Sequence, residues 1–229
     1  MVLRSSEDLP ETCSELQKAS IECVPVEAIK PEAISEKSGF MRSLIAGADY
    51  VIFTSKNSVA FSKGYFSGLY AGRKFLTSGI STKTFAEKSG FKISYAPRIG
   101  GIHAVIKWLV AKRPGTVLCI SGESSSNDFL QVLFRGFTVT EAEVYRIKRL
   151  SPKIPAEAIN GVSHVLFFSS AEVDVFRKAV ASYNSIDFDR IIAVCIGRKA
   201  FERASEIFSK PVLSRRNDIA GAVEVIKNG

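Results

Sequence analysis

The sequence predicts an α/β protein with two flavodoxin-like lobes, each built around a parallel sheet. Two segments carry the same strand–turn–helix pattern: DYVIFTSKNSVAFS at 49–62 and SHVLFFSSAEVDVF at 163–176. Each is a hydrophobic strand that ends in a hydroxyl-bearing turn and leads at once into a helix. Downstream, each copy continues with a second strand that stops at a glycine, Gly79 or Gly197. A repeat of this kind predicts two similar lobes with a cleft between them.

The elements follow one another in the order that a doubly wound parallel sheet requires. The first residues predict a strand over MVLRSS, a helix over EDLPETCSELQKAS and a strand over IECVPV. The segment 101–112 is expected to be a helix, because its apolar residues recur on one face. The middle of the chain is predicted to contain five strands, at 50–54, 74–78, 92–96, 116–120 and 137–140.

The strand count predicts how the lobes are connected. The last part of the chain contains only three predicted strands, at 164–168, 191–196 and 211–214, and the first part contains two. Together these make a second five-stranded lobe. We therefore expect a middle lobe, 35–141, inserted into a discontinuous outer lobe of 1–25 and 151–229. The connecting segments 26–34 and 142–150 are expected to pair as a two-stranded β-ladder hinge.

The charge of the chain limits the classes of partner. The formal net charge is +8 at pH 7, with lysine and arginine dispersed along the chain. General solubility explains such a charge, and so does the binding of a strongly anionic ligand. No basic helix, zinc finger or aromatic–basic RNA motif is present, so we expect no nucleic-acid partner. The chain lacks a signal sequence and any apolar run near the ~20 residues that span a bilayer, which predicts a cytoplasmic protein without a membrane partner.

Metal and cofactor motifs are missing from the sequence. Cys13, Cys23, Cys119 and Cys195 show no CxxC and no metal-ligand spacing, so we expect buried, reduced thiols and no metal. The two histidines are expected to be structural, which leaves no basis for a Ser-His-Asp triad. No glycine-rich nucleotide or phosphate motif is present, so no cofactor is expected.

The candidate site lies where the predicted strands end, because ligands of doubly wound sheets bind at the carboxyl ends of the strands. Turns there offer hydroxyls and free N–H groups that suit anions, although simple helix capping explains the same residue types. These turns comprise Thr54, Ser55, Asn57, Ser58, Ser169, Ser170, the segments 79–82 and 197–199, and SGESS at 121–125, which includes Gly122. Tyr145 follows the last middle-lobe strand. Its phenol could donate a proton to a leaving oxygen, or it could be a half-buried structural tyrosine.

The motifs MVLRSS, DYVIFTSKNSV, GIST, VLCISGESSS through EAEVY, HVLFFSSAEVDVF and AVCIG stand in this order along the chain. With them, nearly the whole chain resembles the uroporphyrinogen-III synthases, a divergent family with short, degenerate motifs. The resemblance implies two α/β lobes joined by a β-ladder. The chain departs from the pattern at Ala200, where the family usually has threonine, and at Ser78, where valine is commoner. Lys199 could replace the missing hydroxyl.

The resemblance also implies an activity. Such a lyase would cyclise hydroxymethylbilane, a linear tetrapyrrole polycarboxylate, with loss of water and inversion of ring D to give uroporphyrinogen III. It would act mainly by positioning the substrate. The resemblance implies no cofactor, a monomeric state and transient contact with the upstream hydroxymethylbilane synthase. Tyr145 would assist departure of the hydroxyl. The implied substrate-binding residues are Arg4, Thr54, Ser55, Ser58, Gly79, Thr82, Gly122, Ser169, Gly197 and Lys199.

Two other functions fit parts of this pattern. A non-catalytic two-lobed binding protein for an anionic small molecule would share the hinge and the donor groups. A tandem receiver or flavodoxin-like regulator would need an acidic phosphorylation pocket or a flavin phosphate loop in each lobe. The sequence shows neither of these features.

Overall fold

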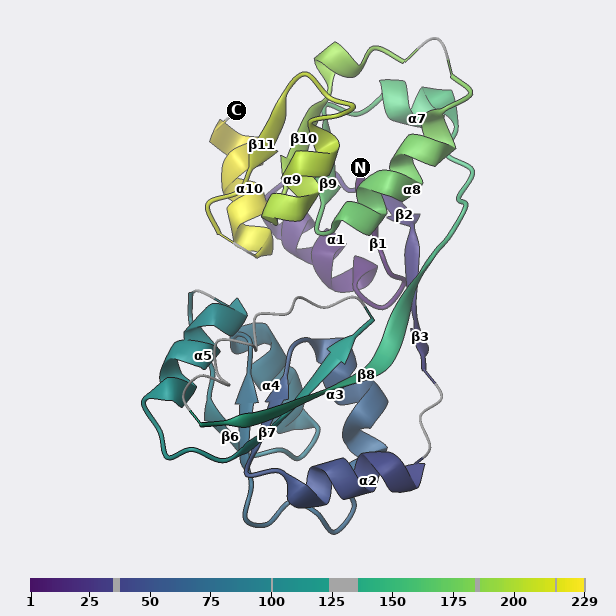
Figure 1. The fold of residues 1–229 in the computed structure, drawn as a ribbon. Helices are drawn as coiled ribbons and strands as arrows, with labels where there is room; N and C mark the ends of the chain where they lie inside the picture. Colours follow the sequence, from purple (N-terminus) through teal and green to yellow (C-terminus); the bar gives the residue numbers. More distant parts are fainter. Residues whose placement is uncertain (35–37, 100, 124–135, 184–185, 217, 229) are drawn as a thin grey trace. The chain divides into compact units, whose positions relative to one another are not determined.

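A computed structural model describes residues 1–34, 38–99, 101–123, 136–183, 186–216 and 218–228. The chain divides into two compact units, shown in Figure 1: Met1–Lys30 with Ile147–Gly229, and Pro31–Arg146. We call them the terminal unit, because it contains both ends of the chain, and the inserted unit. Each is an α/β unit around a mainly parallel sheet, so the predicted fold class is confirmed.

The terminal unit has a five-stranded sheet in the order β11-β10-β9-β1-β2, and every neighbouring pair in it is parallel. The first two strands of the chain and its last three therefore form a single sheet. Its strands are β1 Val2–Arg4, β2 Pro25–Glu27, β9 His164–Phe167, β10 Ile192–Cys195 and β11 Pro211–Leu213. Its helices are α1 Leu9–Lys18, α7 Ala156–Asn160, α8 Ser170–Val180, η2 Phe188–Arg190, α9 Arg198–Ala204 and α10 Ile219–Asn228.

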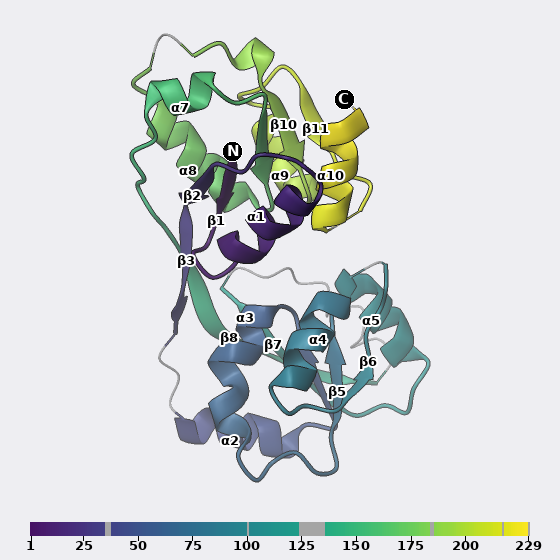
Figure 2. The ribbon, with the colours of Figure 1, turned by 180° about the vertical axis from the view of Figure 1, so that it is seen from behind.

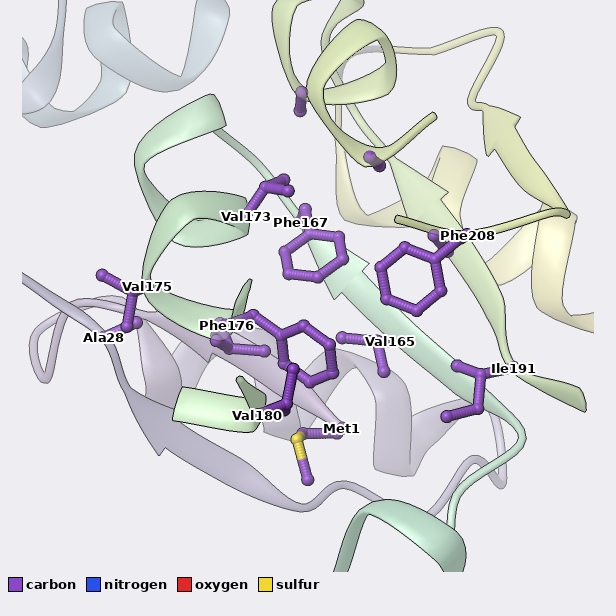
Figure 3. Close-up of a cluster of buried hydrophobic side chains, with 14 of the residues drawn as sticks. Met1, Ala28, Val165, Phe167, Val173, Val175, Phe176, Val180, Ile191 and Phe208 are labelled. Atoms are coloured by element: carbon purple, nitrogen blue, oxygen red, sulfur yellow. The ribbon is translucent and has the colours of Figure 1, made fainter. Parts of the chain in front are cut away.

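Helices cover both faces of this sheet. Successive residues of a strand point to opposite faces, so neighbouring residues of β9 contact different helices. Val165 and Phe167 of β9 pack in the cluster that contains residues of α8 and α9, whereas Leu166 packs with residues of α1 and α10. Figure 3 shows the first cluster, in which the rings of Phe167, Phe176 and Phe208 lie together. This packing holds the start of α8 against the sheet.

The inserted unit has a six-stranded sheet in the order β3-β8-β7-β4-β5-β6. Its strands are β3 Ile29–Ala33, β4 Tyr50–Phe53, β5 Lys74–Thr77, β6 Ile93–Tyr95, β7 Thr116–Gly122 and β8 Thr138–Arg149. Its helices are α2 Ser38–Gly47, α3 Lys56–Ser62, η1 Lys63–Phe66, α4 Ile80–Lys88 and α5 Gly101–Val110. Residues of α2, α3 and α4 pack with one face of this sheet, and residues of α5 pack with the other (Figure 2).

The main differences from the predicted strand extents concern β8 and β2. The segments predicted as a strand at 137–140 and a connector at 142–150 form one continuous strand, β8. The strand predicted over IECVPV begins only at Pro25. Residue 35, the predicted start of the middle lobe, and residues 124 and 125 of the SGESS turn lie outside the described residues.

The prediction of four reduced cysteines is wrong for two of them. Cys13 in α1 and Cys23 just before β2 form a disulfide, with their Cα atoms 5.5 Å apart. The chain turns back after α1, which brings together two residues that are ten positions apart in sequence. No sequence spacing indicated this contact. Cys119 and Cys195 are free and buried, as predicted.

Candidate functional site

The turns of the inserted unit gather at one edge of its sheet. Strand β4 pairs in parallel with both β5 and β7, with Phe53 opposite Thr77 and Ile120. Because parallel neighbours end at the same edge, the turns at Ser55, Gly79 and Gly122 are placed along that edge. The prediction that these turns share one edge of a parallel sheet therefore agrees with the strand register.

Ser55 begins α3 through a reciprocal capping box. Its Oγ accepts the backbone N–H of Ser58 at 3.0 Å, and the Ser58 Oγ accepts the N–H of Ser55 at 3.1 Å. The Ser58 hydroxyl also donates to the Ser55 carbonyl at 2.7 Å, and Ser58 is fully buried. Ser58, predicted as a substrate contact, thus supports the turn from beneath, while the partly exposed Ser55 faces the edge.

Tyr145 lies beside this turn. Its Oη is 3.0 Å from the Ser55 Oγ, and its ring stacks on Phe61 with centroids 5.7 Å apart. A register shift in the pairing of β7 with β8 places Tyr145 opposite Gly122. Such an irregularity re-aims a side chain. Burial raises the pKa of the Tyr145 phenol, and the hydrogen bond with Ser55 opposes this rise in part. The phenol therefore stays protonated at neutral pH.

The glycine opposite the tyrosine leaves room for its ring. A Cβ at Gly122 would lie 2.6 Å from Cζ of Tyr145 and 2.9 Å from its Oη. Carbon atoms in contact are normally about 3.5–4.0 Å apart. Any side chain at position 122 would therefore displace the phenol from Ser55.

The remaining predicted residues of this unit surround the same edge. The Thr54 hydroxyl donates to the Ile120 carbonyl at 3.2 Å. Gly79 is an extended residue directly before α4, and Thr82, at 7% exposure, lies in the first turn of that helix. Ile80 stands between them and is 45% exposed. The exposed apolar side chain of Ile80 thus lies between Gly79 and Thr82, whereas the sequence motifs indicated only polar groups at this edge.

In the terminal unit, Ser169 begins α8 through a second capping box. The Ser169 Oγ accepts the N–H of Glu172 at 3.4 Å. The Glu172 Oε2 accepts the N–H groups of Phe168 at 2.5 Å and Ser169 at 3.0 Å. Glu172 is only 1% exposed. Burial raises its pKa to about 7, although both N–H groups and the charge of Arg4 act in the opposite direction.

Arg4 ends β1 close to this turn. Its Nη2 donates to the Asp8 Oδ2 at 2.7 Å, and its guanidinium lies 3.8 Å from the centre of the Phe168 ring. The Arg4 Nε is buried without a hydrogen-bond partner among the described residues. Arg4 is thus a cation that is held in place but only partly satisfied.

The last predicted turn begins α9. Gly197 is an extended residue before this helix, and Lys199 is exposed. Ala200 is 1% exposed and packs in the core. It occupies the third position of α9, as Thr82 does in α4, so this position faces inward in both helices. The burial explains why an alanine is tolerated there.

Sequence reasoning missed the residues that support the predicted ones. Asp8 and Phe168 hold Arg4, Glu172 holds the Ser169 turn, and Phe61 supports Tyr145. The spacing Ser169-x-x-Glu172 is a capping-box signature and could have indicated Glu172. Asp8 lies only four residues from Arg4, but no recognised motif marks this pair. Phe168 and Phe61 depend on contacts between elements that are far apart in sequence.

Neither a metal centre nor a membrane span is found in the part of the chain that the structure describes. Within the described ranges, no cluster of three or more His, Cys, Asp or Glu side chains is arranged to hold a metal ion. None of the described helices combines the length and hydrophobicity that a bilayer crossing requires.

The fold and these turns define an α/β protein of two parallel-sheet units, whose strand ends present hydroxyl and N–H donors suited to anionic ligands. A family model described as "Uroporphyrinogen-III synthase HemD" matches residues 7–224. The chain therefore belongs to the uroporphyrinogen-III synthase family, as its motifs predicted.

Individual relatives agree with this assignment. The chain is 25% identical to the "Porphyrin biosynthesis protein HemD" of Ruminiclostridium josui, over 96% of this chain and 45% of that protein, so it spans about half the length of this relative. Solved structures share the fold. A mutant uroporphyrinogen III synthase from Thermus thermophilus matches with a TM-score of 0.58 and 15% identity, over 99% of this chain and 96% of that one. The synthase from Helicobacter pylori matches with a TM-score of 0.57 and 13% identity, over 91% and 92%.

Proposed function

We propose that this protein is an active uroporphyrinogen-III synthase. This lyase reaction removes water from hydroxymethylbilane, inverts ring D and closes the macrocycle. The observation that carries the proposal is the pairing of Tyr145 with Ser55 at the carboxyl edge of the inserted sheet, in a chain of this family. A phenol held at a strand end among anion-binding turns suits a polycarboxylate with a leaving hydroxyl.

Tyr145 is proposed to act on the leaving hydroxyl. Its protonated phenol can donate a hydrogen bond to that oxygen while the Ser55 hydroxyl donates to the phenol oxygen. Negative charge on the departing oxygen is stabilised in this way as the pyrrole nitrogen supplies electrons to the carbon left behind. The resulting cation then reacts within the bound chain through the spiro intermediate that inverts ring D. Positioning of the bound substrate decides which isomer forms.

The substrate's carboxylates are proposed to bind at the turns of each unit. Ser55, Gly79 and Thr82 would serve in the inserted unit, and Thr54, whose hydroxyl and N–H both donate to the Ile120 carbonyl, would hold the turn in place. Arg4, Ser169, Gly197 and Lys199 would serve in the terminal unit. The net charge of +8 favours such a ligand. We assign Ser58 to support of Ser55, because it is fully buried, and Gly122 to clearance for Tyr145. We further propose a cytoplasmic monomer that receives its substrate through transient contact with hydroxymethylbilane synthase.

The test is to incubate the protein with freshly generated hydroxymethylbilane and to separate the oxidised porphyrin isomers by chromatography. The type III isomer is expected. Formation of the type I isomer alone, as in the uncatalysed reaction, would refute the proposal, and binding without turnover would favour the non-catalytic alternative.

The role of Tyr145 is tested by Tyr145→Phe. We expect kcat to fall by about 10²-fold or more, the contribution typical of a positioned acid. Tyr65→Phe, at a partly buried tyrosine packed against the core of the same unit, is the matched control and should keep its kcat. Full turnover by Tyr145→Phe would remove Tyr145 from the chemistry while leaving the activity itself intact.

A further inference from the structure

The two capping boxes both begin with a serine, but the second side chain of the box is a hydroxyl in one and a carboxyl in the other. The position three residues after the cap is Ser58 in α3 and Glu172 in α8. Both side chains are buried, but only Glu172 is ionisable. Burying a carboxyl is costly. In the inserted unit a neutral serine accepts the N–H of the cap residue, whereas Glu172 accepts that N–H and also the N–H of Phe168. Capping therefore requires an acceptor oxygen at this position, but it does not require that the buried carboxyl be ionised.

The surroundings of Glu172 place two carboxyl groups around one guanidinium. The charged groups that act on Glu172 are Arg4, at the end of β1, and Asp8, in the turn before α1. Arg4 is hydrogen-bonded to Asp8, and its Nε donor has no partner among the described residues. When Glu172 is ionised, the cluster has one positive and two negative charges. A ligand carboxylate that approaches Arg4 therefore meets a net negative charge.

Protonation of Glu172 removes this obstacle without loss of the cap. Both backbone N–H groups donate to Oε2, so Oε1 can carry a proton while these two bonds persist. The cluster then becomes neutral, and Arg4 and the Ser169 turn can accept an anion. A ligand carboxylate bound nearby would in turn favour the protonated state, since like charges oppose ionisation.

We propose that Glu172 is a positioning residue that takes up one proton from solvent when a carboxylate of the ligand binds at Arg4 and the Ser169 turn. This inference rests on the proposed function, from which it takes the class of ligand. It adds that binding at this site is coupled to pH. Because the pKa of Glu172 in the free protein is about 7, the coupling acts close to neutral pH.

Ligand binding and protonation of Glu172 favour each other, and this sets the direction in which affinity changes with pH. The ligand prefers the protonated form, so affinity is highest below the pKa of the free protein and falls as pH rises above it. One proton per ligand limits this fall to about tenfold per pH unit. The ligand's own carboxyl groups, with ordinary pKa values of about 4, stay ionised throughout this range.

The experiment uses uroporphyrin III, which carries the same carboxylate side chains as the proposed product and is chemically stable. Calorimetric titration in two buffers with different heats of ionisation, slightly above neutral pH, measures the protons taken up on binding. The dissociation constant is then followed from about pH 6.5 to about pH 8.5, where ligand carboxyls do not titrate. For the wild-type protein we expect uptake of a fraction of one proton and a dissociation constant that rises with pH.

Variants locate the proton. Glu172→Gln keeps an acceptor oxygen for the cap but cannot ionise, so its affinity should equal that of the protonated wild type and its proton uptake should disappear. Glu172→Ser, which copies the box of α3, is the second variant and should also bind without proton uptake. Glu157→Gln, at an exposed carboxyl in the first turn of α7, is the matched control and should behave as wild type.

The outcomes separate this inference from the proposed function. The inference is overturned if uroporphyrin III fails to bind, if the wild type takes up no proton, or if Glu172→Gln takes up as much as wild type. Formation of the type III isomer in such a case would still support the enzyme function. Proton uptake that depends on Glu172, in a protein that yields only the type I isomer, would support this inference and refute the activity.

Discussion

The position of the Tyr145 phenol depends on the absence of a side chain at residue 122, and Gly122→Ala tests this dependence. The alanine Cβ would lie 2.6 Å from Cζ, and 2.9 Å from Cε2 and Oη, of Tyr145. Carbon atoms in contact need about 3.5–4.0 Å, so the ring must retreat by roughly 1 Å. The Oη of Tyr145, now 3.0 Å from Ser55, would then leave hydrogen-bonding range.

The expected effect on activity is larger than the effect on stability. Loss of the Ser55 hydrogen bond costs about 1 kcal/mol, and overpacking of a half-buried ring costs about 1–3 kcal/mol. A reacting group misplaced by roughly 1 Å can lower the rate by about 10²-fold. We therefore expect Gly122→Ala to remain folded and to lose about as much kcat as Tyr145→Phe.

The assay is the rate of type III isomer formation, together with urea unfolding of each variant. Gly64→Ala is the matched control, since its Cβ would meet no atom within 4 Å. In the double variant with Tyr145→Phe, the alanine should add little further loss, because both changes remove the same hydroxyl from its place. A wild-type kcat in Gly122→Ala, or losses that add fully in the double variant, would show that activity does not depend on the position of the phenol beside Ser55.

Three further predictions concern stability. Arg73 donates to the carbonyls of Ile45 and Ala46 at the end of α2. Arg73→Ala should therefore lower the free energy of unfolding by about 2–3 kcal/mol, and Arg73→Lys should recover part of this loss. Equal urea midpoints for Arg73→Ala and wild type would contradict this prediction. Replacing Cys13 and Cys23 together with serine should cost about 2–3 kcal/mol, and wild type in reductant should unfold at the same urea concentration as the variant. The pKa of Glu172 is raised from 4.5 to about 7, so its stabilising contribution is present below pH 4.5 and lost as pH rises to about 7. Relative to Glu172→Gln, the wild type should lose up to about 3 kcal/mol over that range, and a constant difference would count against a buried, ionisable Glu172.

Local sequence patterns were sufficient to predict most of the elements. Apolar runs such as YVIF and HVLF are buried strands, and the hydroxyl-bearing residues after them, Ser55 and Ser169, begin helices. These features depend on residues within a few positions of one another, which is why sequence reveals them. The same reasoning could have found Glu172 from the spacing of its capping box. It could not predict that β8 continues unbroken from Thr138 to Arg149, because its extent depends on pairing with neighbouring strands.

The two parallel-sheet units, their turns and the family can be predicted from the sequence alone, since periodicity and short motifs are local properties. Which of those residues come into contact depends on the packing of elements that are distant in sequence. The register shift opposite Gly122 places Tyr145 on Ser55, and the parallel pairing of β1 with β9 brings Arg4 to the Ser169 turn. The disulfide between Cys13 and Cys23 arises in the same way. Each contact joins residues from different elements, and its geometry depends on how those elements pack.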